Sequence, residues 1–144
     1  KNKYPNAIRI FPASGGIRLP ARGVIVKSYG QSSGRGNTAK GLTIAARAGA
    51  QVIAPFDGRI AFSGPFRGYG KIIIIEHRGG YHTLLAGLGR LDSSLGQWIL
   101  AGEPIGAMAG SSGKKTMLYL ELRRRGRAVN PLPWVTYKTV RRRG

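Results

Sequence analysis

The chain has 144 residues, enough for one domain with a hydrophobic core, and 42% of them are hydrophobic, which excludes a disordered tail. It has no cysteine, so disulfide bonds and thiolate metal sites are excluded. Lysine and arginine total 24 against five acidic residues, and the resulting net charge of +19 predicts an anionic partner or environment. Nucleic acid, an anionic membrane surface, an acidic protein and an anionic cell-wall polymer all fit that charge.

Short runs rich in valine, isoleucine, leucine and aromatic residues lie between closely spaced glycines and prolines. None shows the 3.6-residue period of an amphipathic helix, so the pattern predicts an all-β domain with few or no helices. In chain order, the expected strands are 7–11, 23–29, 41–46, 51–54, 58–64, 70–77, 81–88, 97–100, 104–109, 116–124 and 127–129. Polar, glycine-rich segments at 30–39 and 110–115 are expected to be surface loops.

The apolar runs and the first residues of the chain indicate neither a membrane-spanning helix nor a signal peptide. The longest apolar stretch, IIII at 72–75, is far shorter than the roughly 18 residues that a membrane-spanning helix needs. The first residues, KNKYPNAIRI, carry charges and a proline where a signal peptide would have an apolar segment. We therefore expect a mature or excised piece of a longer protein.

The segment TMLYLELRRR, residues 116–125, alternates with period two, which is typical of a strand with one buried face. The buried face is expected to carry Leu118, Leu120 and Leu122. The opposite face carries Met117, Tyr119, Glu121 and Arg123. The alternation leaves the role of this second face open.

Glycines and apolar positions recur in a fixed order through KGLTIAARAGAQVIAPFDGRIAFSG, FRGYGKIIIIEH, GGYHTLLAGLGRL, GQWILAGEPIGAMAGSSG and MLYLELRRRGRAVNPLPW. Over about residues 11–134 this order resembles the LytM-type domain of the family M23 zinc metallopeptidases, which cut peptidoglycan cross-bridges. The resemblance implies a folded antiparallel sheet with a groove. It divides the chain into an N-terminal extension with a first strand at 1–10, a LytM domain at 11–135 and a basic tail at 136–144.

The zinc positions of that family are replaced in this chain. Active members bind zinc with the His and Asp of an H-x-x-x-D segment and the second His of an H-x-H strand, assisted by two further histidines. The windows fall here on Ala39 to Thr43 and on Met117 to Tyr119, and the remaining sheet histidine falls at Gly87. The resemblance therefore implies a degenerate domain with no zinc, no cofactor and no hydrolytic activity.

The chain has two histidines, His77 and His82, and both lie outside those windows. A zinc site needs three or four converging ligands, so structural or surface roles are the favoured interpretation. A weak residual metalloenzyme stays open as an alternative. No serine lies in a nucleophile-elbow motif, and without cysteine no other hydrolytic triad is indicated.

The segments AKGLTI, RGYGKIIIIEH, AGEPIG and LYLELRRRGRAVNPLPW also resemble a narrower family, the murein hydrolase activators typified by EnvC. That resemblance implies a periplasmic, zinc-free LytM domain that activates N-acetylmuramoyl-L-alanine amidases during cell separation. Its empty groove captures a regulatory helix of the amidase and draws it off the amidase's own zinc site. In full-length members, a coiled coil upstream of the domain answers to a membrane division complex.

The groove positions of the activators fall, residue by residue, on Lys40, Thr43, Tyr69, Ile72, Leu85, Tyr119 and Arg123. Thr43 and Leu85 depart from the aliphatic and aromatic residues that the family has there. A guanidinium such as that of Arg123 clamps a carboxylate through two hydrogen bonds, and tyrosines are typical interface anchors. The alternatives are that Ile72 and Leu85 belong to the core, that Tyr119 packs under a loop, and that Arg123 pairs with Glu121 or Glu76.

Two other classes of function remain open. The domain could bind peptidoglycan or an acidic wall polymer as a non-catalytic anchoring module. Nucleic-acid binding would account for the charge, but the basic residues are dispersed and no RNP, KH or helix-turn-helix signature is present. We therefore expect no nucleic-acid partner.

Overall fold

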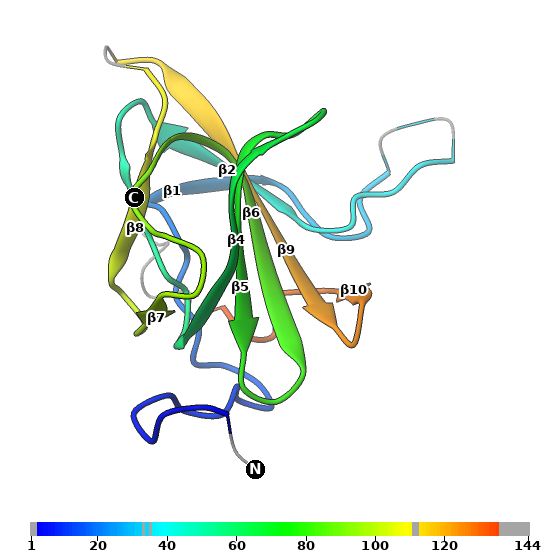
Figure 1. Cartoon of the computed structure of the whole chain (residues 1–144). Coiled ribbons are helices and arrows are strands. Elements are labelled where there is room, and N and C mark those ends of the chain that lie inside the picture. The colour runs from blue at the N-terminus through cyan, green and yellow to red at the C-terminus, as the bar shows by residue number, and fades with distance from the viewer. Residues whose placement is uncertain (1–2, 33, 35, 111–112, 136–144) are drawn as a thin grey trace.

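The computed structural model describes residues 3–32, 34, 36–110 and 113–135, so the basic tail expected at 136–144 lies outside the described residues. The strands are β1 Gly23–Lys27, β2 Leu42–Arg47, β3 Gln51–Ile53, β4 Gly58–Phe66, β5 Gly70–His77, β6 Tyr81–Leu91, β7 Trp98–Ile99, β8 Pro104–Met108, β9 Lys115–Arg124 and β10 Arg127–Val129 (Figure 1). The described ranges contain no helix, which confirms the prediction of an all-β domain. Accordingly, no helix within them is long and apolar enough to cross a membrane.

All of these strands belong to one antiparallel sheet with the order β1-β2-β9-β6-β5-β4-β7. β10 extends the sheet beside β9, and β8 pairs with both β3 and β6. The long strand β6 therefore serves two parts of the sheet: its first half pairs with β9 and its second half with β8. The sheet folds over on itself along this strand, as Figure 1 shows.

Two glycines permit this fold along β6. Gly87 has a φ of 101°, a left-handed conformation that residues with a Cβ rarely adopt. A Cβ on Gly89 would lie 2.4 Å from Cα of Ala109, so only glycine allows the two segments to approach so closely. The bend in β6 thus depends on the absence of two side chains.

The hydrophobic core lies on one face of the sheet. The alternation predicted for residues 116–124 is confirmed, because Leu118, Leu120 and Leu122 are at most 1% exposed. In the sheet register, Leu120 lies opposite Leu42 of β2 and Leu85 of β6. Leucines from these three strands thus build the centre of the core and leave the opposite face of the same strands for other contacts.

The prediction of a first strand at residues 7–11 is wrong. Among these residues only an isolated bridge from Ile10 to Arg78 has strand-like pairing. Other backbone groups bond elsewhere: the amide of Ile8 donates to Pro5 O, and that of Arg9 donates to the carboxylate of Asp57. This segment is held by a local turn and by the side chain of Asp57 rather than by continuous pairing with a neighbouring strand. The other expected strands are present, with bounds that differ by a few residues.

β9 and β10 are joined by a tight two-residue turn. Arg124 pairs with Arg127, and the residues between them, Arg125 and Gly126, have φ values of 51° and 82°. Two positive φ values are typical of a type I′ hairpin turn, which favours asparagine, aspartate or glycine at its first position. Arg125 therefore occupies a conformation that is unfavourable for arginine.

Replacing Arg125 with asparagine is expected to stabilise the domain by about 1 kcal/mol, because asparagine tolerates the left-handed conformation better. The urea midpoint of unfolding, compared between the two proteins at one salt concentration, measures this. An Arg124→Asn variant is the control, because its backbone is extended in β9 and it should gain nothing. A lower midpoint for Arg125→Asn than for the unchanged chain would contradict the assignment of strain.

Candidate partner-binding groove

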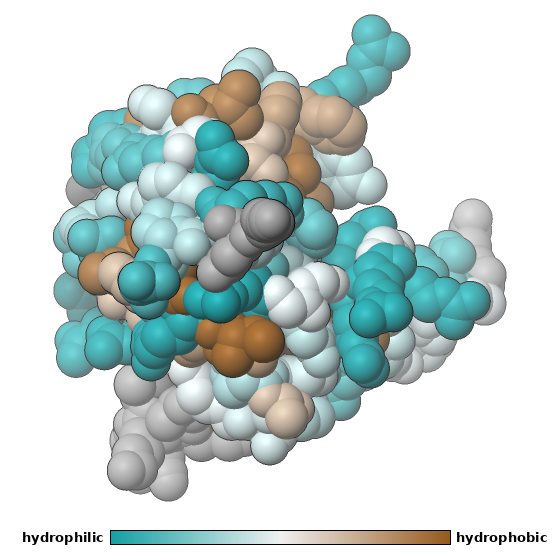
Figure 2. All heavy atoms as spheres, turned by 60° about the horizontal axis from the view of Figure 1, so that its bottom comes forward, coloured by the Kyte–Doolittle hydropathy of each residue, from teal (hydrophilic) through white to brown (hydrophobic). Residues whose placement is uncertain are grey.

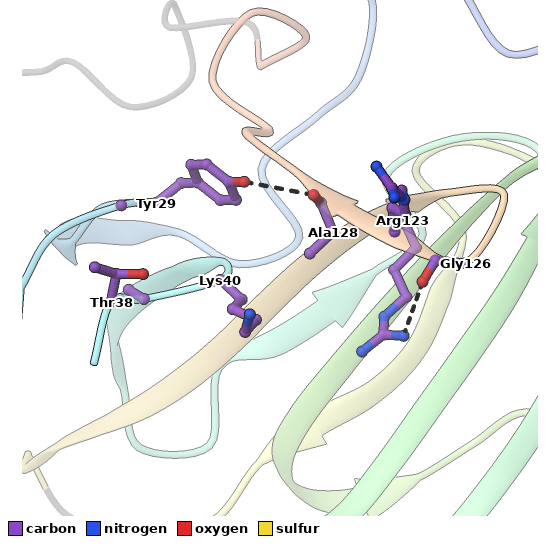
Figure 3. A pocket seen from close by; sticks show the side chains of 9 residues that line it. Tyr29, Thr38, Lys40, Arg123, Gly126 and Ala128 are labelled. Atoms are coloured by element: carbon purple, nitrogen blue, oxygen red, sulfur yellow. Dashed lines mark hydrogen bonds between the residues drawn. The ribbon is translucent and has the colours of Figure 1, made fainter. Parts of the chain in front are cut away.

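A cavity of about 500 Å³ opens beside the end of β9 (Figure 3). It lies between the loop that follows β1 and the β9–β10 hairpin, and it is lined by Tyr29, Gly30, Thr38, Ala39, Lys40, Arg123, Gly126, Arg127 and Ala128. Three of its lining residues are cationic, and none is acidic. The cavity is therefore suited to an anionic group of a ligand.

Two predicted groove residues, Lys40 and Arg123, lie in this cavity. Lys40 comes from the loop that precedes β2, and Arg123 from β9. Tyr29 spans the cavity wall, because its hydroxyl donates to the carbonyl oxygen of Ala128 on β10 at 3.4 Å. Residues far apart in the sequence thus form a single cationic recess.

A buried carboxylate holds Arg123 in place. Glu121 is 6% exposed and accepts hydrogen bonds from Nε of Arg123 at 2.6 Å and from the hydroxyl of Tyr119 at 2.8 Å. Nη1 of Arg123 also donates to the carbonyl oxygen of Gly126 at 3.4 Å. Burial and the hydrogen bond to Glu121 raise the pKa of Tyr119 above its usual range. Arg123 therefore pairs with Glu121, which the sequence left as an alternative to a role in the groove, and Glu121 orients two predicted groove residues of one strand.

The sheet register places further predicted groove residues in one row. Thr43 lies opposite Tyr119, Tyr119 opposite Ala86, and Ala86 opposite Ile72. Since opposed residues share a face of a sheet, Thr43, Tyr119 and Ile72 all point away from the main core. Ile72 is 2% exposed, so it supports the floor of this face and offers a ligand almost no surface.

The exposed apolar and aromatic surface of this face comes from other residues. Tyr69 is exposed at the turn between β4 and β5, and its ring contacts that of Phe66, with 5.8 Å between ring centroids. Met117 on β9 is half exposed and lies opposite Ala45 of β2. Tyr69 and Met117 therefore offer apolar contact area to a ligand.

The prediction that Leu85 is a groove residue is wrong. It lies opposite Leu120 and Ile73, is fully buried and belongs to the hydrophobic core. Its neighbours Leu84 and Ala86 point to the groove face, because successive residues of a strand alternate between faces. Leu85 therefore cannot contact a ligand in the groove and is left out of the site.

Two of the positions that correspond to zinc ligands, Thr43 and Tyr119, lie opposite each other, and neither carries a side chain that zinc prefers. Thr43 faces Tyr119 across β2 and β9, and a Cβ on Gly87 would lie 2.5 Å from the carbonyl oxygen of Met117. With Ala39 they offer a hydroxyl, a phenol, a thioether and a methyl group, which do not make the nitrogen and carboxylate set that zinc prefers. Among the described residues no three His, Asp or Glu side chains group together.

We therefore expect the purified chain to hold no stoichiometric zinc after dialysis against a weak chelator. Elemental analysis by mass spectrometry measures the metal content directly. Zinc near one equivalent per chain would contradict the assignment and direct attention to the two histidines.

The buried histidine has a structural role. His77 is fully buried; its Nδ1–H donates to the carbonyl oxygen of Asp57 at 2.8 Å, and its Nε2 accepts from the hydroxyl of Thr83 at 2.7 Å. Burial lowers the pKa of His77 to about 4. The ring is thus held neutral with both nitrogens bonded, which leaves neither free for a metal. His82 is half-buried and lies opposite Glu76 and Arg123 in the register.

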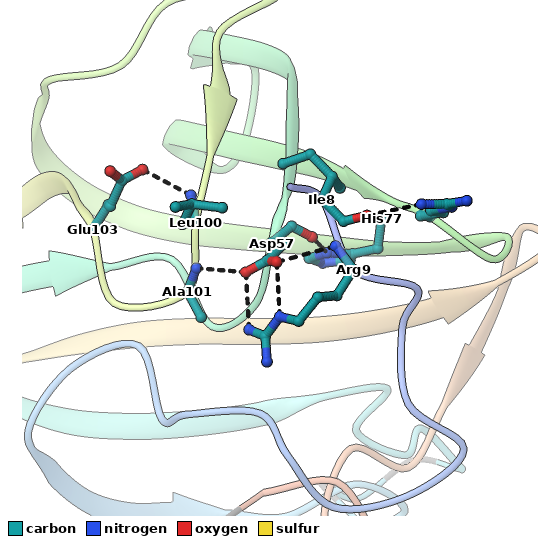
Figure 4. Close-up of polar contacts among 8 residues, drawn as sticks. Ile8, Arg9, Asp57, His77, Leu100, Ala101 and Glu103 are labelled. Atoms are coloured by element: carbon teal, nitrogen blue, oxygen red, sulfur yellow. Dashed lines mark hydrogen bonds and ion pairs between the residues drawn. The ribbon is translucent and has the colours of Figure 1, made fainter. Parts of the chain in front are cut away.

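Asp57 ties the N-terminal segment to this part of the sheet (Figure 4). Its carboxylate is 1% exposed and accepts from Nε and Nη2 of Arg9 at 2.9 and 3.0 Å, and from the amide of Ala101 at 2.9 Å. Burial opposes ionisation of this carboxyl, but the hydrogen bonds from Arg9 and Ala101 outweigh it and lower the pKa to about 2. Asp57 is therefore a structural anchor and not a groove residue.

Several residues that line the cavity were not predicted from the sequence. Tyr29, Thr38, Arg127 and Ala128 reach the cavity through the loop after β1 and through the β9–β10 turn. An available signal was the polar, glycine-rich segment at 30–39, which directly precedes Lys40. The RGR sequence at 125–127 also indicates a tight turn that brings Arg127 back beside β9.

The chain is similar to known proteins in sequence and in fold. Residues 37–131 match Peptidase family M23. The chain is 38% identical to the murein hydrolase activator EnvC of Escherichia coli K12 over 118 residues, and 36% identical to the murein hydrolase activator NlpD of the same strain over 119 residues. These alignments cover 81% and 82% of this chain but only 28% and 31% of the relatives.

Among solved structures, Helicobacter pylori Csd3 from a hexagonal crystal superposes with a TM-score of 0.73 at 24% identity. The superposition covers 86% of this chain and 34% of that one. At this identity, the likeness supports the fold alone. The fold agrees with the folded sheet expected from the sequence.

Proposed function

The chain belongs to peptidase family M23, and from that premise we propose that it is a non-catalytic activator of a cell-wall amidase. The observation that carries the proposal is a groove whose zinc positions have lost their ligands while Glu121 holds Arg123 and Tyr119 in fixed orientations. The relatives EnvC and NlpD are named murein hydrolase activators. The chain spans less than a third of their length, so the proposal concerns the activity of this part.

The ligand we propose is a regulatory helix of an N-acetylmuramoyl-L-alanine amidase. A cationic recess, together with exposed aromatic and apolar side chains such as Tyr69 and Met117, fits an amphipathic helix. Arg123 and Lys40 would bind acidic side chains of the helix, and Tyr69, Tyr119 and Met117 would contact its apolar face. Capture of the helix would uncover the zinc site of the amidase.

This function places the domain in the bacterial cell envelope, where peptidoglycan is split during cell separation. A periplasmic location follows from the proposal, because the amidase acts on peptidoglycan there. The groove itself needs no metal or cofactor for this task, since it acts by binding alone.

Binding to a purified zinc amidase tests the proposal. The affinity of the chain is compared between the full amidase and the same enzyme with its regulatory helix deleted, by calorimetry at one salt concentration. We expect binding to the full enzyme and its loss on deletion. Equal binding to both enzymes would contradict helix capture, and binding to isolated sacculi that survives groove substitutions would favour a wall-binding module instead.

A further inference from the structure

Two turns meet at the end of the sheet where β5 and β9 finish. The amide of Arg125, in the β9–β10 turn, donates to the carbonyl oxygen of Gly80 in the β5–β6 turn at 3.0 Å. On the other side of that turn, a Cβ on Gly79 would lie 3.2 Å from Cγ1 of Ile10. Ile10 and the arginine turn thus lie on either side of two glycines. We call the surface formed by Ile10, Arg78, Arg124 and Arg125 the arginine end.

Neighbouring contacts hold two of the three arginines of this surface. Nη1 of Arg78 donates to the carbonyl oxygen of Ile8 at 3.0 Å, and the guanidinium of Arg124 lies over the ring of Tyr81 at 5.8 Å. Arg124 also lies directly opposite Arg127 in the β-ladder, a like-charge pairing that costs stability. Arg125 adds the unfavourable turn conformation described above. Cations kept at a cost to the free protein indicate a bound state in which they are compensated.

Among the described residues, no acidic side chain forms an ion pair with Arg78, Arg124 or Arg125. All five acids lie in the described ranges, and four form ion pairs: Asp57 with Arg9, Glu76 with Lys3, Asp92 with Arg90 and Glu121 with Arg123. The fifth, Glu103, accepts from the amide of Leu100. Glu76 and Asp57, the acids nearest along the chain to Arg78 and Ile10, are both among the paired ones. Another molecule can therefore supply the negative charge that these arginines lack within the described part of the chain.

Ile10, the apolar side chain of the arginine end, indicates which kind of anionic partner fits this surface. Ile10 is 65% exposed and forms an isolated bridge with Arg78, so this surface offers an apolar side chain next to one of its cations. Figure 2, which brings the lower side of Figure 1 forward, shows hydrophilic residues around small separate hydrophobic patches on that side. A cationic surface with an exposed apolar side chain is typical of proteins that lie on anionic bilayers.

We infer that the arginine end binds the surface of a membrane that contains anionic phospholipids. The guanidinium groups of Arg78, Arg124 and Arg125 contact lipid phosphates, for which arginine is well suited because it donates two hydrogen bonds at once. Ile10 enters the interfacial layer. This inference does not depend on the amidase, because it uses residues outside the groove.

The test is sedimentation of the 144-residue chain with vesicles of phosphatidylcholine alone or with phosphatidylglycerol added, at several salt concentrations. We expect binding only to the anionic vesicles. Removing two charges with Arg124→Gln and Arg125→Asn should weaken binding by about 25-fold, at about fivefold per arginine. The matched control is Arg47→Gln with Lys115→Gln, a facing pair at the opposite end of the sheet, which should change binding far less.

A separate variant tests insertion. Ile10→Ser should lower binding to anionic vesicles several-fold while leaving the charge unchanged. Equal losses from the two double variants would show diffuse charge attraction and overturn the assignment of this surface. Binding that is unaffected by Ile10→Ser and fully competed by poly-L-glutamate would identify a soluble polyanion as the partner and overturn the membrane inference.

Discussion

Replacing Arg123 with alanine is expected to weaken activation of the amidase by about 30-fold or more, the effect of losing a hot-spot contact of about 2 kcal/mol. The guanidinium of Arg123 is the cation in the recess that an internal acid holds in place, so a ligand carboxylate meets it already oriented. Its side chain is 44% exposed, so its removal opens no cavity in the core, but it leaves the buried Glu121 with the hydroxyl of Tyr119 as its side-chain partner, and folding of the variant is checked first. The concentration of domain that gives half-maximal amidase activity measures the loss.

A neighbouring arginine supplies the control for this experiment. Arg124→Ala removes the same charge from the next residue of β9, whose side chain points to the other face and lies over Tyr81. We expect activation by this variant to stay close to that of the unchanged chain. Tyr119→Phe, which removes only the hydroxyl bonded to Glu121, should fall between the two. Equal activation by Arg123→Ala and Arg124→Ala, with both folded, would show that general charge drives the interaction.

Lowering the pH from about 6.5 to about 4 is expected to destabilise the domain by about 3 kcal/mol through His77. Burial lowers the pKa of His77 from 6.5 to about 4 in the folded protein. Below pH 6.5 the unfolded chain therefore binds a proton at this residue that the folded chain does not. Unfolding becomes steadily more favourable as the pH falls, until the folded state also takes up the proton near pH 4.

Asp57 changes the stability of the domain over a second, lower range of pH. Its pKa is 3.8 ordinarily and about 2 in the folded protein, so its contribution is complete above pH 3.8 and is lost as the pH falls towards 2. This loss amounts to about 2 kcal/mol, because each pKa unit corresponds to about 1.4 kcal/mol. The two groups therefore act in succession, the histidine first and the carboxylate at stronger acidity.

Urea unfolding at a series of pH values from 7 to 2.5 separates these contributions. His77→Gln should flatten the dependence between pH 6.5 and 4 and leave the lower window, whereas Asp57→Asn should flatten only the lower one. Both variants lower stability at pH 7, since each removes a bonded buried group. A free energy of unfolding that stays constant from pH 7 to 4 in the unchanged chain would contradict the neutral, buried state of His77.

Much of the sheet could be predicted because its strands carry clear local patterns. The alternation around Leu118, Leu120 and Leu122 needs only the period of a strand, and it correctly placed Tyr119, Glu121 and Arg123 on the other face. Glycines and prolines set the ends of most strands. The segment 7–11 has a similar apolar content but is not a strand, because the distant carboxylate of Asp57 takes up the amide of Arg9.

The groove was harder to predict than the sheet. A shift of one residue moves a side chain to the other face, and this is the error at Leu85. Arg127 and Tyr29 reach the cavity only because a turn and a loop bring them beside β9, which no periodic pattern reports. The pairing of Arg123 with Glu121 was within reach, since residues two apart on a strand share a face.

The central claim, that this zinc-free groove activates another enzyme, is tested most directly by dye release from labelled cell-wall sacculi. The chain is assayed alone, then with a purified zinc amidase, and then with the amidase and the Arg123→Ala variant. We predict no release by the chain alone, strong stimulation of the amidase, and loss of that stimulation with the variant. Dye release by the chain alone, or stimulation that the variant matches, would contradict the account.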